Sequence, residues 1–368
     1  MTEGKQAGMF RWGIIGAGYA ARKFVLGLRA SDGGAPVLVC SRTEANAAAF
    51  ARDFGIANVR SSVEEAARSP DVDAFYIATP PSAHRHQAIA CLSAGKAVLV
   101  EKPFAASRAD AEAMLEAARS SGVFCMEGMW TRFLPLVGEL RTMIHAQAIG
   151  TPRSLCGSFG ASNLPDPDES LFNRDLAGGA LLHRGIYPLA MAFDLMGEGE
   201  LAAAAARQGA TGVDEDCVLA LRHGNGALST VRASLRAPLP NDLTIEGDHG
   251  FIHVHAPIFR PFRLTLTRTR PASRPKAGNL RLERLREGAL AQAAQQRLRG
   301  LAAALRSGGR RTVTRAYAGN GYHYEADEVM RCVQRGEKES ALMPLAQSVA
   351  MAALIDEARA SWAGQRPQ

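Results

Sequence analysis

Short apolar runs alternate with amphipathic stretches through the first third of the chain, and this alternation most constrains the possible fold. Five such runs are present: RWGIIGAG (11–18), PVLVCSR (36–42), VDAFYIATPPS (72–82), AVLVEKPF (97–104) and VFCMEG (123–128). Strands that alternate with helical patterns of about 10–15 residues predict a parallel, doubly wound sheet. Such sheets bind ligands beyond the carboxyl ends of their strands, so the residues that follow each run are the first candidates for a site.

The first turn carries a glycine pattern that fits a bound dinucleotide. It reads G-x-G-x-x-A from Gly16 to Ala21, after a predicted strand and at the start of a predicted helix. Gly16 permits the tight turn, Gly18 lets the backbone approach a pyrophosphate, and Ala21 allows close helix–strand packing. The alternative is a glycine-rich turn without a ligand. The cofactor-binding candidates are Gly16, Ala17, Gly18, Tyr19 and Ala20.

The end of the second strand indicates which dinucleotide is preferred. An NAD site usually has Asp or Glu here to bind the ribose 2′-hydroxyl, whereas this chain has Cys40, Ser41 and Arg42. Ser41 can donate a hydrogen bond, and the planar guanidinium of Arg42 matches a phosphate group. These residues favour NADP(H). The alternative is an ordinary exposed Ser-Arg pair at the start of a helix.

The fourth run ends on a charged pair held by a proline, in the order Glu101, Lys102 and Pro103. Charged side chains are seldom buried without a partner or a task. Pro103 fixes its own φ and restricts Lys102 to extended conformations. From the residues alone, the pair is either a structural ion pair or part of a site at the strand end.

From about residue 131 the pattern changes to that of a second domain. We expect helices over 134–150 and 178–197, a strand over 152–162, and hairpins over 214–236 and 242–255. The predicted fold is an α/β Rossmann domain, residues 1–130, followed by an α+β domain, residues 131–368, with a mostly antiparallel open sheet.

Charge is concentrated in one segment. The chain has a formal net charge of +7, yet residues 260–315 alone hold fifteen Lys and Arg against two Asp and Glu. Nucleic-acid binding is one interpretation, but few aromatic residues interleave with the arginines, and a solvated basic face is favoured. The segment includes an insertion, about 268–312, with an amphipathic helix predicted over 283–306. That helix either covers the cleft or packs on the domain exterior, which we favour.

Composition excludes several other classes. No apolar run approaches the roughly 20 residues of a membrane span, and the N-terminus lacks the apolar core of a secretory signal, so we expect a cytoplasmic protein without a membrane partner. The six cysteines are widely spaced, which predicts buried free thiols and no metal site.

Three segments together resemble one enzyme family. GIIGAGYAA, YIATPPSAHRHQAIACLSAGKAVLVEKPF and GGALLHRGIY occur in the order found in the glucose–fructose oxidoreductase/inositol dehydrogenase/rhizopine catabolism (Gfo/Idh/MocA) family. MEGMWTRFLP and the segment GNGYHYEADEVMRCVQRGEKESALMPLAQS are similar to the branch that contains dimeric dihydrodiol dehydrogenase and 1,5-anhydrofructose reductase. The resemblance implies that Lys102 is the catalytic lysine and that Glu101 lies at the cofactor cleft. It also implies cofactor contacts for Thr79, Pro80, Pro81 and His84, although His84 could equally be structural.

The resemblance also identifies a catalytic tyrosine and one departure from the family. Family members commonly read G-G-A-L-L-D-x-G with His or Tyr four residues after the Asp, whereas here Tyr187 takes the last position and His183 replaces the Asp. We expect Lys102 to lower the pKa of Tyr187. His183 is either a protonated relay or a space-filling residue, and it favours an anionic or less hydroxylated substrate. Trp130 and Arg132 are implied substrate contacts, and core packing is an alternative for Trp130.

These observations predict an oxidoreductase that transfers a hydride between NADP(H) and a ketone or secondary alcohol of a sugar-like or cyclic diol substrate. The alternative is a non-catalytic NADP-binding regulator of the same fold. The resemblance further implies a homodimer or higher homo-oligomer built on the second sheet. We expect no nucleic-acid partner.

Overall fold

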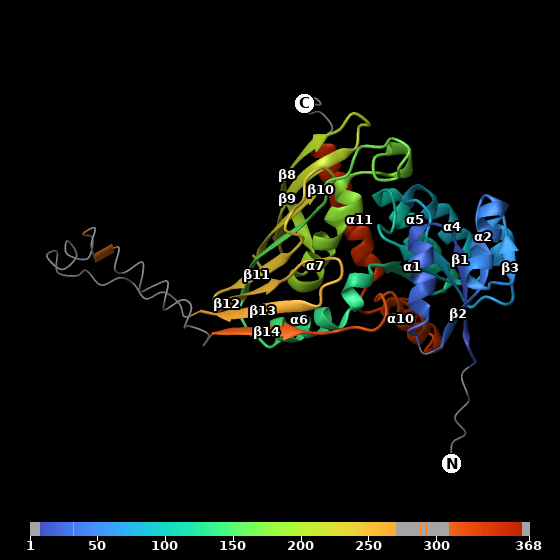
Figure 1. Ribbon diagram of the computed structural model, residues 1–368, viewed down its shortest axis with the longest axis horizontal. Coiled ribbons are helices and arrows are strands. Elements are labelled where there is room, and N and C mark those ends of the chain that lie inside the picture. Colours follow the sequence, from blue (N-terminus) through green and yellow to red (C-terminus); the bar gives the residue numbers. More distant parts are fainter. Residues whose placement is uncertain (1–7, 32, 270–287, 289–290, 293–308, 363–368) are drawn as a thin grey trace, which may run out of the picture.

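The computed structural model describes residues 8–31, 33–269, 288, 291–292 and 309–362, and its strands form two sheets (Figure 1). The first has six strands in the order β3-β2-β1-β4-β5-β6, and every neighbouring pair is parallel. The strands are β1 (Phe10–Ile15), β2 (Gly34–Cys40), β3 (Asn58–Arg60), β4 (Ala74–Ile77), β5 (Ala97–Glu101) and β6 (Cys125–Gly128). This confirms the predicted doubly wound sheet.

Helices cover both faces of this sheet. The connecting helices are α1 (Tyr19–Leu28), α2 (Glu44–Phe54), α3 (Val63–Ala67), α4 (Pro81–Ser93) and α5 (Arg108–Ser121). Ser62 and Ser107 cap two of them by accepting hydrogen bonds from backbone N–H groups in the first turn. Gly55 and Gly122 end two helices in the left-handed conformation that glycine adopts most easily.

The second sheet has eight strands in the order β14-β13-β12-β11-β7-β10-β9-β8. Only the β7–β10 pair is parallel, so the sheet is mostly antiparallel, as predicted. Its strands are β7 (Pro152–Gly160), β8 (Gly199–Gln208), β9 (Asp214–His223), β10 (Leu228–Ser234), β11 (Leu243–Gly247), β12 (Gly250–Val254), β13 (Arg263–Arg268) and β14 (Arg310–Thr314). Both predicted hairpins, β9–β10 and β11–β12, are present.

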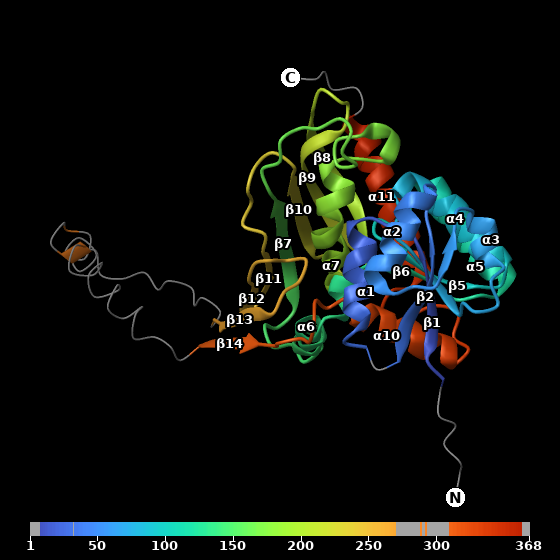
Figure 2. The same cartoon turned by 45° about the vertical axis from the view of Figure 1, so that its right-hand side comes forward.

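The remaining helices lie between the two sheets and leave one face of the second sheet without a covering layer in the described part of the chain (Figures 1 and 2). They are α6 (Pro135–His145), α7 (Ile186–Met196), α10 (His323–Gln334) and α11 (Leu345–Trp362), with short 3-10 turns at Trp130–Phe133 and Arg174–Leu176. A π-helical turn, Leu181–Gly185, runs directly into α7. The sequence predicted one regular helix here, and the wider turn is a correction.

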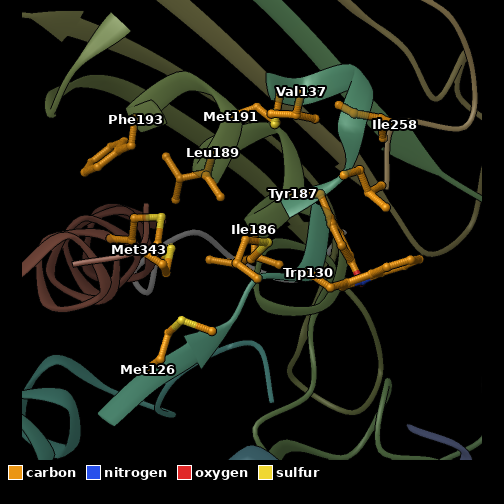
Figure 3. Close-up of a cluster of buried hydrophobic side chains, with 14 of the residues drawn as sticks. Met126, Trp130, Val137, Ile186, Tyr187, Leu189, Met191, Phe193, Ile258 and Met343 are labelled. Carbon is orange, nitrogen blue, oxygen red and sulfur yellow. The ribbon is translucent and has the colours of Figure 1, made fainter. Parts of the chain in front are cut away.

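Helix α10, which precedes the C-terminal helix α11, packs on the first sheet rather than the second. Its buried residues share a cluster with Trp12 and Phe24, and Ser31 donates a 2.5 Å hydrogen bond to Asp327. The same apolar cluster continues through α6 and α7 to the second sheet (Figure 3). A second, smaller cluster fills the space between the first sheet and α3, α4 and α5.

One further prediction, about the cysteines, needs correction, and another, about the insertion helix, falls outside the described residues. Five cysteines are buried and free, but Cys156 is exposed on the uncovered face of the second sheet. The helix predicted over 283–306 lies almost entirely outside the described residues, and β14 begins at Arg310, inside the range expected for the insertion. Every helix among the described residues is too short or insufficiently apolar to cross a lipid bilayer.

Candidate active site

The Glu101–Lys102–Pro103 turn follows β5, a strand buried at all five positions. The Glu101 carboxylate accepts a 2.5 Å hydrogen bond from the Tyr76 hydroxyl and a 3.0 Å bond from the backbone N–H of Lys102. Glu101 therefore binds the backbone of the lysine rather than its ammonium group. This fixes the direction in which Lys102 leaves the strand end.

Two further buried side chains hold the same turn. A carboxylate oxygen of Glu127 accepts a 3.0 Å hydrogen bond from the Phe104 backbone N–H. The His84 ring lies between the Glu101–Pro103 turn and the segment that follows β4. Its Nδ1 atom is 3.1 Å from the Pro103 carbonyl oxygen, and its Nε2 atom is 2.9 Å from the Thr79 carbonyl oxygen. His84 is fully buried and is a structural residue in this geometry, which is one of the two alternatives left open by the sequence.

Lys102 and Tyr187 meet at the boundary between the two sheets. The Lys102 Nζ atom donates a 3.5 Å hydrogen bond to the His183 carbonyl oxygen and lies 5.2 Å from the centroid of the Tyr187 ring. The Tyr187 hydroxyl accepts a 3.4 Å hydrogen bond from Trp130 Nε1, and Figure 3 shows the two side chains directed at each other. The structure thus brings together the predicted lysine, tyrosine, histidine and tryptophan.

These four residues line a cavity of about 350 Å³ with a largely aromatic wall. The Trp130 and Tyr322 rings stack at 4.6 Å, and Phe159 and Phe259 stack at 5.2 Å. Tyr187 meets Phe159 edge to face, with centroids 5.5 Å apart. A small organic molecule in this cavity would contact apolar ring surfaces and a few polar groups, a typical composition for a substrate pocket.

Burial shifts the pKa of two of these residues. Burial raises the pKa of Tyr187 and outweighs the nearby Lys102 ammonium, so the expectation of a lowered pKa is wrong. Burial, together with the positive charge of Lys102, lowers the pKa of His183 to about 3. His183 is therefore neutral near pH 7, which argues against the protonated relay, one of the two alternatives that the sequence left open.

Arg132 is not placed as the sequence predicted. Its side chain is buried behind the cavity, where the guanidinium donates 2.7 Å hydrogen bonds to the Ala190 carbonyl oxygen and to Gln347. It joins the turn before α6 to α7 and α11 and does not line the cavity. The expected substrate contact is thus replaced by a structural role, because the arginine points from the 3-10 turn into the protein interior.

A separate cavity of about 270 Å³ lies at the carboxyl ends of β1, β2 and β4. Among the predicted cofactor residues, it is lined by Gly16, Ala17, Gly18, Ser41, Arg42, Thr79 and Pro80. Tyr19 instead lines the aromatic cavity, whereas Ala20, Pro81, His84 and Glu101 line neither. The two cavities share no lining residue and lie on either side of the start of α1.

The glycines of the first turn fit a dinucleotide. A Cβ atom at Gly16, which has a φ of +105°, would lie 2.5 Å from the Ala78 carbonyl oxygen, so this position requires glycine. A Cβ atom at Gly18 would meet nothing within 4 Å, which leaves open space at the N-terminus of α1. A pyrophosphate can occupy that space, where backbone N–H groups and the helix dipole favour negative charge.

Several lining residues were not predicted. In the cofactor cavity these include Ser61, Ser82 and Gln87, which accepts a 2.6 Å hydrogen bond from Thr79. In the aromatic cavity they are Lys23, Phe159, Leu171, Arg184, Phe259, Arg260, Asn320 and Tyr322. Asn320 and Tyr322 belong to the GNGYHYE segment, which carried a signal through the family resemblance. The sequence offers no comparable signal for Phe259 and Arg260.

A dinucleotide-binding sheet, an open antiparallel sheet, and a lysine and tyrosine between them define a nicotinamide-dependent oxidoreductase. Comparison with known proteins gives the family. Residues 10–129 match the oxidoreductase family with an NAD-binding Rossmann fold, and residues 137–253 match the GFO/IDH/MocA C-terminal domain. The chain belongs to the Gfo/Idh/MocA family.

Curated relatives match nearly the whole chain. Trans-1,2-dihydrobenzene-1,2-diol dehydrogenase of Mus musculus is 31% identical over 361 residues, covering 95% of this chain and 96% of the relative. The Bos taurus enzyme of the same name is 32% identical over 358 residues, with the same coverage.

Solved structures share the fold. KijD10, a 3-ketoreductase from Actinomadura kijaniata in complex with NADP and TDP-benzene, superposes with a TM-score of 0.77 at 22% identity, covering 96% of this chain and 97% of that chain. Levoglucosan dehydrogenase in complex with NADH gives a TM-score of 0.77 at 23% identity, covering 95% and 97%.

Proposed function

We propose that this protein is an NADP(H)-dependent dehydrogenase or reductase that acts on a secondary alcohol or ketone of a sugar-like or cyclic diol substrate. The observation that carries the proposal is the convergence of Lys102 and Tyr187 in an aromatic cavity beside the dinucleotide site. The dihydrodiol dehydrogenase relatives and the 3-ketoreductase with the same fold support the substrate class.

Lys102 and Tyr187 have different roles at the substrate oxygen. Bound NADPH would supply the hydride to the carbonyl carbon, which leaves negative charge on the oxygen. The Lys102 ammonium stabilises that charge, and the Tyr187 hydroxyl donates its proton to form the alcohol. Because burial raises the pKa of Tyr187, the hydroxyl keeps its proton near neutral pH. After transfer, the nearby ammonium stabilises the tyrosinate.

The preference for NADP(H) rests on Ser41 and Arg42. Both line the cofactor cavity at the end of β2, and that cavity has no carboxylate among its described lining residues to repel a 2′-phosphate. Arg42 is exposed and makes no ion pair with the described carboxylates, so its guanidinium is free to bind a phosphate.

The first experiment measures NADPH consumption with ketoses, keto-sugars, dicarbonyls and, in the reverse direction with NADP⁺, dihydrodiols. We expect turnover with at least one class. Binding of NADP⁺ without turnover of any compound would favour the non-catalytic regulator.

The second experiment assigns the chemistry to the two residues. We expect Lys102→Met and Tyr187→Phe to lower kcat at least about 100-fold, as for removal of one charge-stabilising donor. Both should keep NADP⁺ affinity, which is measured separately by calorimetry. Lys96→Met is the matched control, because Lys96 lies at the opposite end of β5 and donates a 2.8 Å hydrogen bond to the Val72 carbonyl oxygen. Near-wild-type kcat in either active-site variant would contradict the role assigned to it.

A further inference from the structure

The aromatic cavity is strongly positive. Its lining residues include four cationic side chains, Lys23, Lys102, Arg184 and Arg260, and no Asp or Glu. Arg184 is buried, Lys23 and Lys102 are half-buried and Arg260 is exposed, so the cost of a charge without a counter-charge falls mainly on Arg184. A pocket for a neutral sugar or diol has no need of four converging positive charges, which would favour a structural partner, a cofactor phosphate or an anionic ligand.

Carboxylate partners within the protein do not account for the four charges. None of the four cations lies within 4.0 Å of a carboxylate oxygen among the described residues. Lys23 and Arg260 lie against the rings of Tyr19 and Phe259, 5.2 and 5.7 Å from their centroids. Neither is held away from a ligand by a carboxylate of the described residues.

Arg184 is held more firmly, but by neutral groups. Its guanidinium donates hydrogen bonds to the carbonyl oxygens of Ala161 and Ser234 and to the Asn163 side chain. Glu169 acts on it electrostatically from a greater distance. The positive charge of Arg184 is thus fixed beside the cavity without a direct counter-ion among the described residues.

The phosphate groups of the cofactor are expected to bind in the cofactor cavity rather than in the aromatic cavity. The pyrophosphate space and the Ser41–Arg42 pair belong to the other cavity, which shares no lining residue with the aromatic one. The four cations are therefore not needed for the pyrophosphate or the 2′-phosphate.

His183 provides an independent sign of a ligand. Its Nε2 atom is buried and has no hydrogen-bond partner among the described residues, although the residue lines the cavity. A buried polar atom without a partner is costly and calls for an explanation, such as a bound water, an ion or a functional role. Because the imidazole is neutral, this position adds no negative charge to the cavity.

We propose that the substrate is anionic: a polyhydroxylated ketone or alcohol of about monosaccharide size that carries a carboxylate or phosphate group. Arg260 and Lys23 bind the anionic group, the neutral His183 hydrogen-bonds a hydroxyl, and Lys102 and Tyr187 face the reacting oxygen. The volume of about 350 Å³ lies at the small end of ligand pockets and suits a molecule of this size. This inference rests on the proposed function and narrows its substrate class.

Equilibrium binding tests the inference without turnover. The enzyme saturated with NADP⁺ is titrated calorimetrically with D-glucitol, D-gluconate and D-glucitol 6-phosphate, which differ mainly in one terminal group. We expect at least one anion to bind tenfold or more tightly than D-glucitol, and the stronger of the two identifies the carboxylate or the phosphate. Equal affinities for all three, or binding of neither anion, would overturn the proposal.

Charge-neutral variants locate the effect. Arg260→Gln and Lys23→Gln should each reduce the preference for the anion at least fivefold. NADP⁺ affinity should stay within twofold of that of the wild type. Arg263→Gln is the matched control, because Arg263 is exposed three residues along the chain and does not line the cavity. Weaker NADP⁺ binding with an unchanged anion preference would show that the cations serve the cofactor and would overturn the proposal.

Turnover distinguishes failure of the anionic-substrate inference from failure of the proposed oxidoreductase function. We expect NADPH-dependent reduction of 5-keto-D-gluconate to exceed that of D-fructose in kcat/KM, and the advantage to shrink as salt increases. Preferred turnover of D-fructose would overturn the anionic substrate and leave the oxidoreductase intact. Anion-selective binding with no reduction of any carbonyl would support the anion site and remove the proposed function.

Discussion

Burial is the largest cause of the pKa shifts of several ionisable groups around Lys102. It raises the pKa of Tyr187 and Glu101, and it raises that of Glu325, where the charge of Glu101 adds to the effect. It lowers the pKa of His183. The family resemblance identified Lys102 and Tyr187, but no sequence pattern reports how deeply such groups are buried. For that reason the sequence could not show that the net shift in the pKa of Tyr187 is upward, or that His183 is neutral near pH 7, which argues against the relay alternative.

The first residue-scale prediction concerns His183. Its folded pKa of about 3 lies below the ordinary 6.5, so the folded state resists protonation and stability is lost as pH falls below 6.5. Between pH 7 and pH 5 we expect the wild type to lose about 2 kcal/mol of unfolding free energy that His183→Asn does not lose. Denaturant unfolding at the two pH values measures the difference.

The same pKa has a kinetic consequence. Between pH 5 and pH 8 the wild type and His183→Asn should show the same shape of kcat/KM against pH, because the imidazole does not titrate there. If kcat/KM of the wild type changes with pH in this range and that change is absent from His183→Asn, His183 would be the proton relay after all.

The second residue-scale prediction concerns Arg42. Loss of a charge-assisted contact to the 2′-phosphate should weaken NADPH binding by about 1.5–3 kcal/mol in Arg42→Ala. NADH binding should change little. Calorimetric titration with both cofactors checks the prediction, and Arg29→Ala serves as an exposed control outside the cofactor cavity. Equal affinity of the wild type for the two cofactors would count against it.

At the scale of elements, the π-helical turn Leu181–Gly185 determines how the active-site helix begins. The Leu181 N–H donates a 2.7 Å hydrogen bond to the buried Asp214 carboxylate, and the His183 N–H donates a 3.2 Å bond to the Gly179 carbonyl oxygen. Gly179 has a φ of +127°, and a Cβ atom there would lie 2.2 Å from the Asp214 side chain. The turn therefore depends on glycine at this position.

We expect Gly179→Ala to destabilise the fold by more than about 1 kcal/mol and to lower kcat/KM through displacement of His183. Gly138→Ala is the control, because Gly138 lies inside α6 with nothing within 4 Å of an added Cβ atom. That change should stabilise the protein by about 0.5–1 kcal/mol. Denaturant unfolding and steady-state kinetics measure both effects. A Gly179→Ala enzyme as stable and active as the wild type would refute the dependence.

Elements with strong apolar patterns were predictable, and those shaped by tertiary contacts were not. The runs that became β1, β2, β4, β5 and β6 are buried strands of a parallel sheet, for which the apolar pattern is a sufficient signal. β8 contains five consecutive alanines, which favour helix, and forms a strand because it pairs with β9. β3 has only three residues and is half-buried, so its pattern is too short to detect. The π-turn shares its apolar pattern with a regular helix.

For the molecule as a whole, the uncovered face of the second sheet is the surface that most needs a partner. Val218, Leu228 and Phe251 are 43%, 52% and 37% exposed on neighbouring or nearby strands of this face. A sheet with one uncovered face that carries exposed apolar side chains is commonly covered by another layer. Together with the family resemblance, this favours a homodimer or higher homo-oligomer that pairs through the second sheet.

We expect light scattering at micromolar concentration to give at least a dimer for the wild type and a smaller species for Leu228→Asp. The introduced charge would be desolvated at the interface, which is costly. Leu164→Asp is the control, because Leu164 is 89% exposed on the loop after β7 and lies off the sheet. A monomeric wild type would contradict the prediction.

The packing of α10 on the first sheet limits how freely the two halves of this protein could be recombined in evolution or by design. Asn320, just before α10, donates a 2.7 Å hydrogen bond to the Lys23 carbonyl oxygen, and Met330 of α10 packs close to Gly34 and Trp12. A fragment that stops near residue 130 retains the dinucleotide motif but loses α10, one of the helices that pack on its sheet beside α1. The N-terminal sequence alone therefore does not encode the whole nucleotide-binding half, because one helix of that half comes from near the other end of the chain.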